Sequence, residues 1–144
     1  MKILILDGPN MNLIGTRQPE IYGTVTFAAL REKIKEKAAE LGAEVAFFQS
    51  NHEGALVDAI QNAAGKYDGI LLNAAAYTHT SIAIPDAVLA VGIPTVEVHL
   101  SDPDRREPFR KINFLRSVCR KTFSGKGADS YLSAIEFLVC GEKA

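Results

Sequence analysis

Short apolar runs alternate with amphipathic segments along almost the whole chain, and this alternation limits the folds that are open to it. The runs cover Lys2–Asp7, Ala43–Ser50, Gly69–Asn73 and Pro94–His99, and a weaker run covers Lys121–Ser124. Each run is mostly continuous and ends at a polar residue or a turn signal, as expected of strands that are buried on both faces. The pattern therefore predicts five strands.

The segments between these runs have helical periodicity. Apolar residues recur at helical spacing from Thr26 to Leu41, with Thr26 as a candidate N-cap and Gly42 as a C-terminal stop. The same pattern marks residues 56–64, 82–89 and 131–138. Strands that alternate with helices are typical of α/β proteins, and five strands favour a flavodoxin-like, doubly wound parallel sheet in the order 2-1-3-4-5, with helices on both faces.

Length and composition predict one folded domain over residues 1–144, since 47% of the residues are hydrophobic and only 23% are charged. The 16 Lys and Arg residues are balanced by 17 Asp and Glu residues, so we expect no nucleic-acid partner. No apolar stretch approaches membrane-spanning length, and the first run is too short for a signal peptide. We expect a cytoplasmic protein in which Cys119 and Cys140 are buried thiols on helices.

Polar residues gather where the predicted strands end. They lie at residues 7–10, 50–53, 73–79 and 97–101, and all three histidines of the chain fall in these stretches. Ligand sites of doubly wound sheets lie beyond the carboxyl ends of the strands. The sequence therefore predicts a polar site at this edge of the sheet.

The connection from Gly8 to Val25 is much longer than usual, and loops of this length are often functional lids. It carries Asn12, Arg17 and Tyr22. A tyrosine with a pKa of about 10 is a poor base, but an arginine about 4 Å away could lower that pKa by up to about 3. Tyr22 is thus a candidate base activated by Arg17. The spacing is equally compatible with a Tyr22 ring packed under the loop and Arg17 in water.

Glu97 and His99 share one face of a predicted strand, so the carboxylate can orient the imidazole and favour its protonated form. That arrangement would make His99 an acid for a departing hydroxyl, although a lone histidine at a strand end more often bonds to backbone. His79 follows Asn73 by one short loop and precedes a predicted helix. Its position suits either the binding of ligand hydroxyls or the bracing of the loop.

Other chemistries have weaker signals. His52, His79 and His99 come from separate loops and form no HxxxH or HExxH pair, so we expect no metal site. The stretch 125–127 matches neither a Walker loop nor GxGxxG, so we expect no cofactor either. A phosphoacceptor receiver domain would need an acid at the end of the third strand, where this chain has Asn73.

Six sequence motifs follow one another along the chain in the order and at the spacing of a known family. They are Gly8–Arg17, Pro19–Gly23, Phe48–Gly54, Ala76–Ser81, Glu97–Ser101 and Arg105–Arg110. With these motifs the chain closely resembles the type II dehydroquinases from residue 1 to about residue 138. The resemblance implies a shikimate-pathway enzyme that needs no cofactor and forms no lysine Schiff base. Its implied reaction is the dehydration of 3-dehydroquinate to 3-dehydroshikimate, by anti elimination through an enolate.

The resemblance also implies roles for individual residues. Tyr22 would abstract the proton beside the ketone, Arg17 in the mobile lid would stabilise charge, and His99, oriented by Glu97, would protonate the leaving hydroxyl. The other implied site residues are Asn12 at the enolate through a water, Asn73, His79 and Arg110 at ring hydroxyls, Leu100 and Ser101 at the carboxylate, and Asp86 at the site of a neighbouring subunit. Members of the family form trimers that associate into dodecamers, which implies a homo-oligomer.

The chain departs from the family pattern near the expected site. Asp7 stands where Asn is common, Ala74-Ala75 replaces Pro-Gly, Lys111-Ile112-Asn113 replaces His-His-Ser, and Pro85 precedes Asp86 in an early helical turn. Asp102-Pro103 replaces Asn and a β-branched residue, which adds negative charge beside the carboxylate site unless Arg105, Arg106 or Arg110 offsets it. The main alternative is a non-catalytic flavodoxin-like ligand-binding module. A metal-dependent hydrolase that uses the histidines is a third reading.

Overall fold

The computed structural model describes residues 1–16, 18–22 and 24–141, without the side chain of Tyr22, and these residues build a five-stranded sheet. The strands are β1 (Lys2–Asp7), β2 (Glu44–Gln49), β3 (Gly69–Asn73), β4 (Thr95–Val98) and β5 (Thr122–Phe123). Their order is β2-β1-β3-β4-β5, and each neighbouring pair is parallel. The flavodoxin-like order predicted from the alternating pattern is therefore confirmed.

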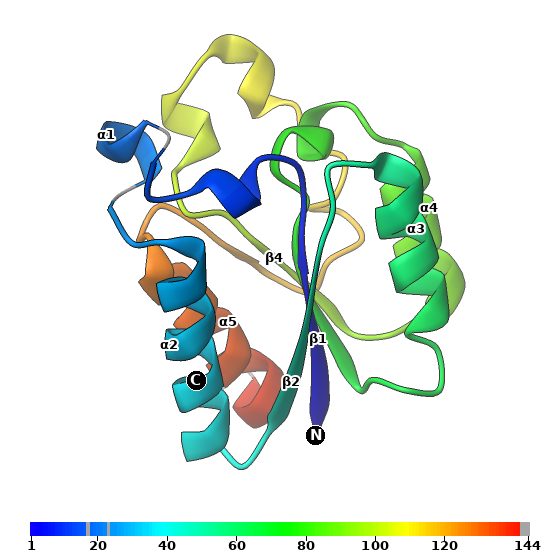
Figure 1. Cartoon of the computed structure of the whole chain (residues 1–144). Helices are drawn as coiled ribbons and strands as arrows, with labels where there is room; N and C mark the ends of the chain where they lie inside the picture. Colours follow the sequence, from blue (N-terminus) through cyan, green and yellow to red (C-terminus); the bar gives the residue numbers. More distant parts are fainter. Residues whose placement is uncertain (17, 23, 142–144) are drawn as a thin grey trace.

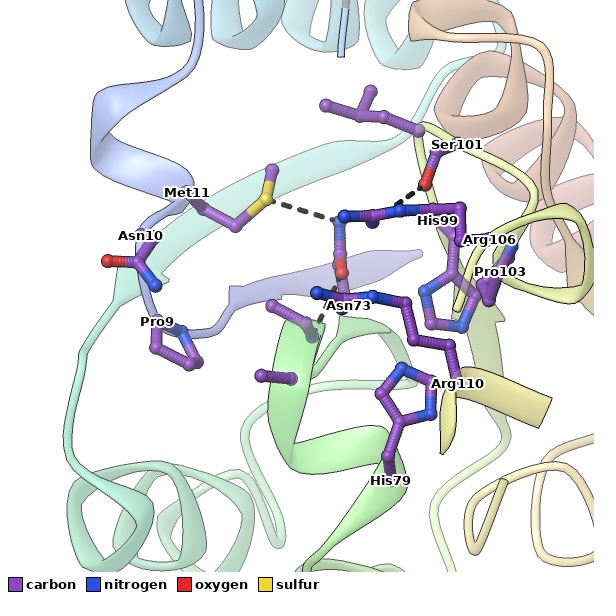
Figure 2. A pocket seen from close by; sticks show the side chains of 13 residues that line it. Pro9, Asn10, Met11, Asn73, His79, His99, Ser101, Pro103, Arg106 and Arg110 are labelled. Atoms are coloured by element: carbon purple, nitrogen blue, oxygen red, sulfur yellow. Dashed lines mark hydrogen bonds between the residues drawn. The ribbon is translucent and has the colours of Figure 1, made fainter. Parts of the chain in front are cut away.

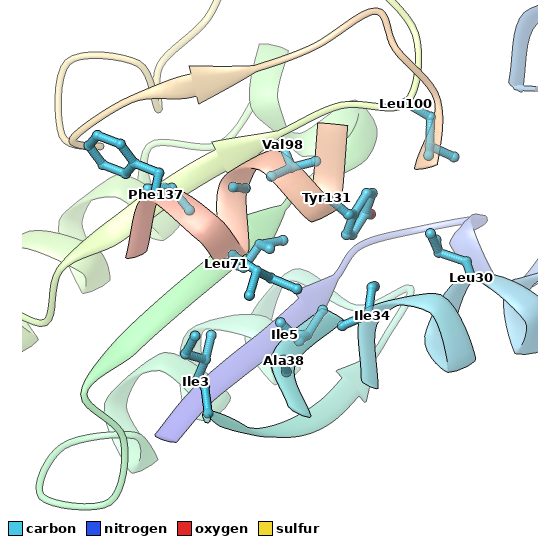
Figure 3. Packing of buried hydrophobic residues seen from close by; sticks show 14 of the residues in the cluster. Ile3, Ile5, Leu30, Ile34, Ala38, Leu71, Val98, Leu100, Tyr131 and Phe137 are labelled. Atoms are coloured by element: carbon cyan, nitrogen blue, oxygen red, sulfur yellow. The ribbon is translucent and has the colours of Figure 1, made fainter. Parts of the chain in front are cut away.

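Helices cover both faces of the sheet (Figure 1). α2 (Phe27–Glu40) and α5 (Ala128–Cys140) lie on one face, and α3 (Glu53–Asn62) and α4 (Ala83–Val91) lie on the other. Successive residues of a strand point to opposite faces. The odd-numbered isoleucines of β1 accordingly pack under α2 and α5 (Figure 3), and its leucines pack under α3 and α4. The inner strands read as continuous apolar runs because both of their faces are buried.

The first long helix, α2, forms as its sequence predicts. Thr26 caps it, because the Thr26 hydroxyl accepts a hydrogen bond from the Ala29 amide at 3.1 Å. Leu30 and Ile34 are fully buried at a spacing of four residues, and they pack against β1. Gly42 follows the helix with a φ of +72°, a conformation that glycine adopts without strain.

Some predictions fail at the edges of the fold. β2 is an edge strand and is only partly buried, with Phe48 39% exposed, so it is not a strand buried on both faces. Cys140 lies at the end of α5 but is exposed. Cys119 lies outside the helices, in a turn, where burial raises the pKa of its thiol to about 12. Neither cysteine is thus a buried thiol on a helix.

The carboxyl end of the sheet carries the long connections. The segment after β1 contains the 3₁₀ turn η1 (Met11–Leu13) and the short helix α1 (Pro19–Tyr22). Three more 3₁₀ turns lie after β3 and β4: η2 (Ala75–His79), η3 (Pro103–Arg105) and η4 (Pro108–Lys111). Figure 1 shows these turns and α1 at the same end of the molecule, opposite the N-terminus. Among the helices of the described residues, none has the length and apolar character that a membrane span requires.

Candidate active site

A pocket with a volume of about 160 Å³ opens at the carboxyl end of the sheet (Figure 2). Its lining comes from the segments after β1, β3 and β4, and from η4. The lining residues are Pro9, Asn10, Met11, Asn73, Ala75, Ala76, His79, His99, Leu100, Ser101, Pro103, Arg106 and Arg110. The structure thus brings together six of the residues that the sequence indicated: Asn73, His79, His99, Leu100, Ser101 and Arg110.

The ends of β1 and β3 approach closely at the base of this pocket. The Gly8 amide donates a hydrogen bond to the Asn73 carbonyl at 2.7 Å, which extends the pairing of the two strands. A β-carbon at position 8 would lie 2.5 Å from the Ala74 carbonyl oxygen, so only glycine fits there. This contact sets where the chain turns into Pro9 and Asn10, which line the pocket.

The two asparagines after β1 differ in position. Asn10 lines the pocket, has a φ of +69°, and donates from its amide to Asn51 Oδ1 at 3.0 Å. Asn12 lies in η1, exposed, with its Oδ1 3.4 Å from Gln49 Nε2. The structure therefore brings Asn10, and not Asn12, into the pocket. The sequence-based assignment of individual residues omitted Asn10. Its position in the first turn after a strand, at the edge of the sheet where ligands bind, is the signal that could have identified it.

Glu97 and His99 form a buried pair beneath the pocket. Glu97 is 0% exposed, and its Oε1 lies 2.6 Å from His99 Nε2. The same carboxylate accepts from Asn113 Nδ2 and from the Thr122 hydroxyl, each at 2.6 Å. Burial raises the pKa of Glu97, but the hydrogen bond from His99, the charge of His99 and the hydrogen bonds from Thr122 and Asn113 together outweigh burial and hold that pKa below its ordinary value. An ionised Glu97 accepts the Nε2 proton, so Nδ1 is the His99 nitrogen left for the pocket.

His79 is held in one tautomer by the backbone. Its Nδ1 lies 2.6 Å from the Ile112 carbonyl, which can only accept, so Nδ1 carries the proton. Burial lowers the pKa of His79, and electrostatic interactions with His99 and Arg110 lower it further, against the opposing effects of the bond to Ile112 and of the Glu97 charge. The neutral ring therefore offers Nε2 as a hydrogen-bond acceptor, as a ligand hydroxyl requires.

Cationic side chains stand at one side of the pocket. Arg106 Nη1 donates to the Ser101 hydroxyl at 3.4 Å, and Arg110 pairs with Glu107. Figure 2 shows the side chains of both arginines extending toward Asn73 from the side of the pocket where His99 is labelled. Positive charge and hydroxyl donors in one wall suit an anionic ligand group. Arg106 was considered from the sequence only as an offset to Asp102.

Asp102 does not line this pocket. Its Oδ1 accepts from the Asp104 amide at 3.1 Å, where it caps η3, and its Oδ2 lies 3.4 Å from Arg105 Nε. A turn and an arginine therefore compensate the extra negative charge expected beside the carboxylate site, and Asp102 lines an adjoining hollow rather than the pocket.

A second hollow adjoins the pocket under α1. Its volume is about 500 Å³, and Pro19, Glu20 and Ile21 form one wall. It shares three lining residues with the pocket: Leu100, Ser101 and Arg106. The helix that ends at Tyr22 therefore borders the site. Arg17 and the Tyr22 side chain lie outside the described residues.

Two predicted contributors lie away from the pocket. Asp86 is exposed on α4 and is absent from the pocket lining. His52 is exposed at the start of α3. Within residues 1–16, 18–22 and 24–141, no three His, Cys, Asp or Glu side chains gather as a group that could hold a metal ion.

Comparisons with known proteins identify the family of the whole chain. The family model described as Dehydroquinase class II matches residues 1–139. The 3-dehydroquinate dehydratase of Geotalea daltonii is 54% identical over 132 residues, which cover 92% of each chain. That of a Nostoc species is 52% identical over 139 residues, or 96% of this chain and 95% of the relative. The type II dehydroquinase structure from Butyrivibrio crossotus superposes with a TM-score of 0.94 at 44% identity, covering 96% and 97% of the two chains. The chain therefore belongs to the class II dehydroquinase family.

Proposed function

We propose that this chain, by family a 3-dehydroquinate dehydratase of the shikimate pathway, eliminates water in the described pocket by an anti mechanism through an enolate. The observation that carries the mechanism is the Glu97–His99 pair, a buried carboxylate bonded at 2.6 Å to an imidazole that lines the pocket. Such a pair can supply the acid that a poor leaving group needs.

His99 is the proposed acid. Glu97 holds the ring through Nε2, and a protonated His99 releases its Nδ1 proton to the departing hydroxyl, which leaves as water. Asn113 and Thr122 support this geometry because their hydrogen bonds to Glu97 keep the carboxylate ionised and fixed. The product is 3-dehydroshikimate.

Tyr22 is the proposed base and Arg17 its activating cation, both carried by a lid over residues 8–25. The second hollow supports this assignment, because α1, the helix that ends at Tyr22, lines this hollow and the hollow shares Ser101 with the pocket. The phenolate takes the proton beside the ketone, and the electron pair moves into the enolate. The two catalytic protons balance, since Tyr22 gains one and His99 loses one, and both groups reset through solvent.

Asn10 is the proposed enolate stabiliser, in place of Asn12. Its presence in the pocket lining supports the change, since a donor in the lining can reach developing charge directly or through one water, whereas Asn12 lies outside that lining. Asn73, His79 and Arg110 would hold ring hydroxyls, for which the neutral His79 offers an acceptor and Arg110 a donor. Leu100 and Ser101 would bind the carboxylate with a backbone amide and a hydroxyl, beside the positive charge of Arg106.

We propose that the chain forms a homo-oligomer and that the face around Asp86 is a contact between subunits. Ile82 and Leu89 flank Asp86 at spacings of four and three residues on one side of the α4 region, and they are 56% and 64% exposed. Phe109 and Ile112 are also largely exposed, near the end of η4. Exposed apolar side chains of this size suit burial against another copy, which would bring Asp86 to a neighbouring site. Trimers that assemble into a dodecamer, in the cytoplasm, are the proposed form.

The decisive test mixes purified protein with 3-dehydroquinate and follows the ultraviolet absorbance of the conjugated enone. Turnover should survive a chelator and borohydride pretreatment, because the proposed mechanism uses neither a metal ion nor an imine. Loss of turnover with chelator would favour a metal-dependent enzyme. Ligand-induced thermal protection without turnover would favour a binding module.

Tyr22→Phe tests the base directly. The substitution removes the phenolic oxygen with little change in volume, so kcat should fall at least about a hundredfold. The oligomeric mass and the melting temperature should stay unchanged, which would separate a chemical loss from unfolding. Activity within about tenfold of the wild type would remove Tyr22 from the role of base.

A further inference from the structure

A buried hydrogen-bond chain runs from the interior of the protein to the floor of the pocket. The Tyr131 hydroxyl donates to Asp7 Oδ1 at 2.6 Å, and Asn73 Nδ2 donates to the Tyr131 oxygen at 2.7 Å. All three residues are at most 3% exposed, and only Asn73 lines the pocket. Tyr131 comes from α5, in the cluster shown in Figure 3, whereas Asp7 and Asn73 end the neighbouring strands β1 and β3.

The donor-to-acceptor direction of these hydrogen bonds decides which side-chain atoms of Asn73 face the pocket. A phenol carries one hydrogen, and Tyr131 donates it to Asp7, so its oxygen faces Asn73 as an acceptor. Asn73 must then turn its NH₂ group toward Tyr131. Its Oδ1 accepts from the Ala75 amide at 3.1 Å, which agrees with the same orientation.

The second N–H of Asn73 lies against a weak partner. Asn73 Nδ2 is 3.4 Å from the Met11 sulfur, and a thioether is a poor acceptor. Met11 lines the pocket too, and Figure 2 shows this contact in the pocket wall. A substrate hydroxyl can therefore replace the sulfur as acceptor without disturbing the bond to Tyr131.

The carboxyl group of Asp7 is costly to bury in its charged form. Burial raises the pKa of this carboxyl to about 6, against the lowering effects of the Tyr131 hydrogen bond and of the positive charge of Arg31 on α2. Because a charged group is costly to bury and Asp7 does not line the pocket, its burial needs an explanation other than direct contact with the substrate. The hydrogen bond that its carboxylate accepts from Tyr131 leads on to Asn73.

We propose that Asp7 and Tyr131 are positioning residues, which together fix the Asn73 amide so that it offers an N–H donor to a hydroxyl of the bound substrate. The proposal rests on the proposed function, in which Asn73 holds a ring hydroxyl. Neither Asp7 nor Tyr131 touches the substrate. Both act by excluding the flipped orientation of the Asn73 side-chain amide. In that orientation its Oδ1, rather than an N–H donor, would face the substrate hydroxyl.

The test is a double-mutant cycle in steady-state kinetics with 3-dehydroquinate. Asn73→Ala should raise KM on the order of tenfold, the loss expected for one hydrogen bond, and change kcat less. Tyr131→Phe should raise KM by a similar factor. In the Asn73→Ala background, Tyr131→Phe should have no further effect on KM, because it acts only through Asn73. A merely structural role of Tyr131 would instead multiply the two losses.

Two substitutions at position 7 test whether a conservative replacement of Asp7 preserves substrate binding. Asp7→Asn keeps an oxygen acceptor for Tyr131, so its KM should stay within about twofold of wild type, whereas Asp7→Ala removes the acceptor and should raise KM like Tyr131→Phe. Should Tyr131→Phe fail to fold around the unpaired carboxylate, the double variant Asp7→Asn/Tyr131→Phe removes the buried charge and completes the cycle in its place.

The possible outcomes distinguish a failure of the positioning role from a failure of the binding role of Asn73 or of the proposed function. A higher KM in Asn73→Ala, with an unchanged KM in folded Tyr131→Phe, would overturn the positioning proposal and leave the role of Asn73 standing. Multiplying losses would overturn it as well. An unchanged KM in Asn73→Ala would overturn both the positioning proposal and the binding role of Asn73. Absence of turnover by the folded wild type would refute the proposed function itself.

Discussion

Replacing Asp7 with asparagine should stabilise the protein at neutral and alkaline pH. Asp7 is 1% exposed, and burial is the largest cause that raises its pKa from 3.8 to about 6. At about 1.36 kcal/mol per pKa unit, this difference corresponds to about 3 kcal/mol. The asparagine side chain does not ionise, and its oxygen can still accept from Tyr131, so the Asp7→Asn variant avoids that cost. The gain therefore has a ceiling of about 3 kcal/mol.

The pH dependence fixes the sign of this effect. Between pH 3.8 and about 6 the folded wild type holds a proton on Asp7 that the unfolded chain releases, so wild-type stability falls as pH rises through this window. The advantage of Asp7→Asn should therefore be absent near pH 4, grow across the window, and be complete by about pH 7. At neutral pH the ceiling corresponds to a melting temperature higher by about 6 to 12 °C for a chain of this size.

The assay is thermal unfolding of both proteins at equal concentration from about pH 4 to about pH 8, because oligomers unfold in a concentration-dependent way. Asp58→Asn, at an exposed acid on α3, controls for the loss of one negative charge. A variant that is no more stable than wild type at the alkaline end of this range would refute the reasoning. A difference that stays constant across the whole range would also refute it, because an ionisation could not then be its source.

Three further predictions concern the site and the assembly. Asn10→Gly, which keeps the positive φ, should lower kcat about tenfold or more, whereas Asn12→Ala should change it less than about twofold; equal losses in the same enone assay would reject Asn10 as the enolate stabiliser. Glu97→Gln should lower kcat on the order of a hundredfold while KM changes little, since the imidazole loses its anionic partner; a KM effect alone would mean that Glu97 serves binding. Leu89→Glu should reduce the molar mass measured by light scattering after size exclusion, unlike Lys33→Glu on α2, and an unchanged mass would place the subunit contact elsewhere.

The succession of strands and helices could be predicted because it depends on local patterns, and the order of the strands in the sheet followed from the doubly wound arrangement that such a succession favours. Continuous apolar runs such as Gly69–Asn73 indicate buried parallel strands, and the capped, periodic segment from Thr26 to Leu41 indicates a helix between two of them. The exposure of β2 could not be predicted this way. Its residues read about as apolar as those of the inner strand β1, but β2 lies at the edge of the sheet, where Phe48 is 39% exposed.

Part of the site could be predicted for the same reason. Asn73, His79 and His99 follow strand ends, and the carboxyl ends of parallel strands meet at one edge, so their convergence in one pocket follows from topology. The choice between Asn10 and Asn12 could not be predicted. The two lie two residues apart, and the turn geometry after β1 decides which one reaches the pocket.

The sequence by itself determined the succession of strands and helices, the edge at which the polar residues gather, and the motifs that mark the family, because each depends on residues close together in the chain. The tertiary structure decided the hydrogen bonds between distant residues. Tyr131 and Asp7 are 124 positions apart. Asn113 reaches Glu97 from the connection between β4 and β5, and Thr122 reaches it from the neighbouring strand β5. Such contacts form only when packing removes water and brings polar groups together from different elements, so no local pattern records them.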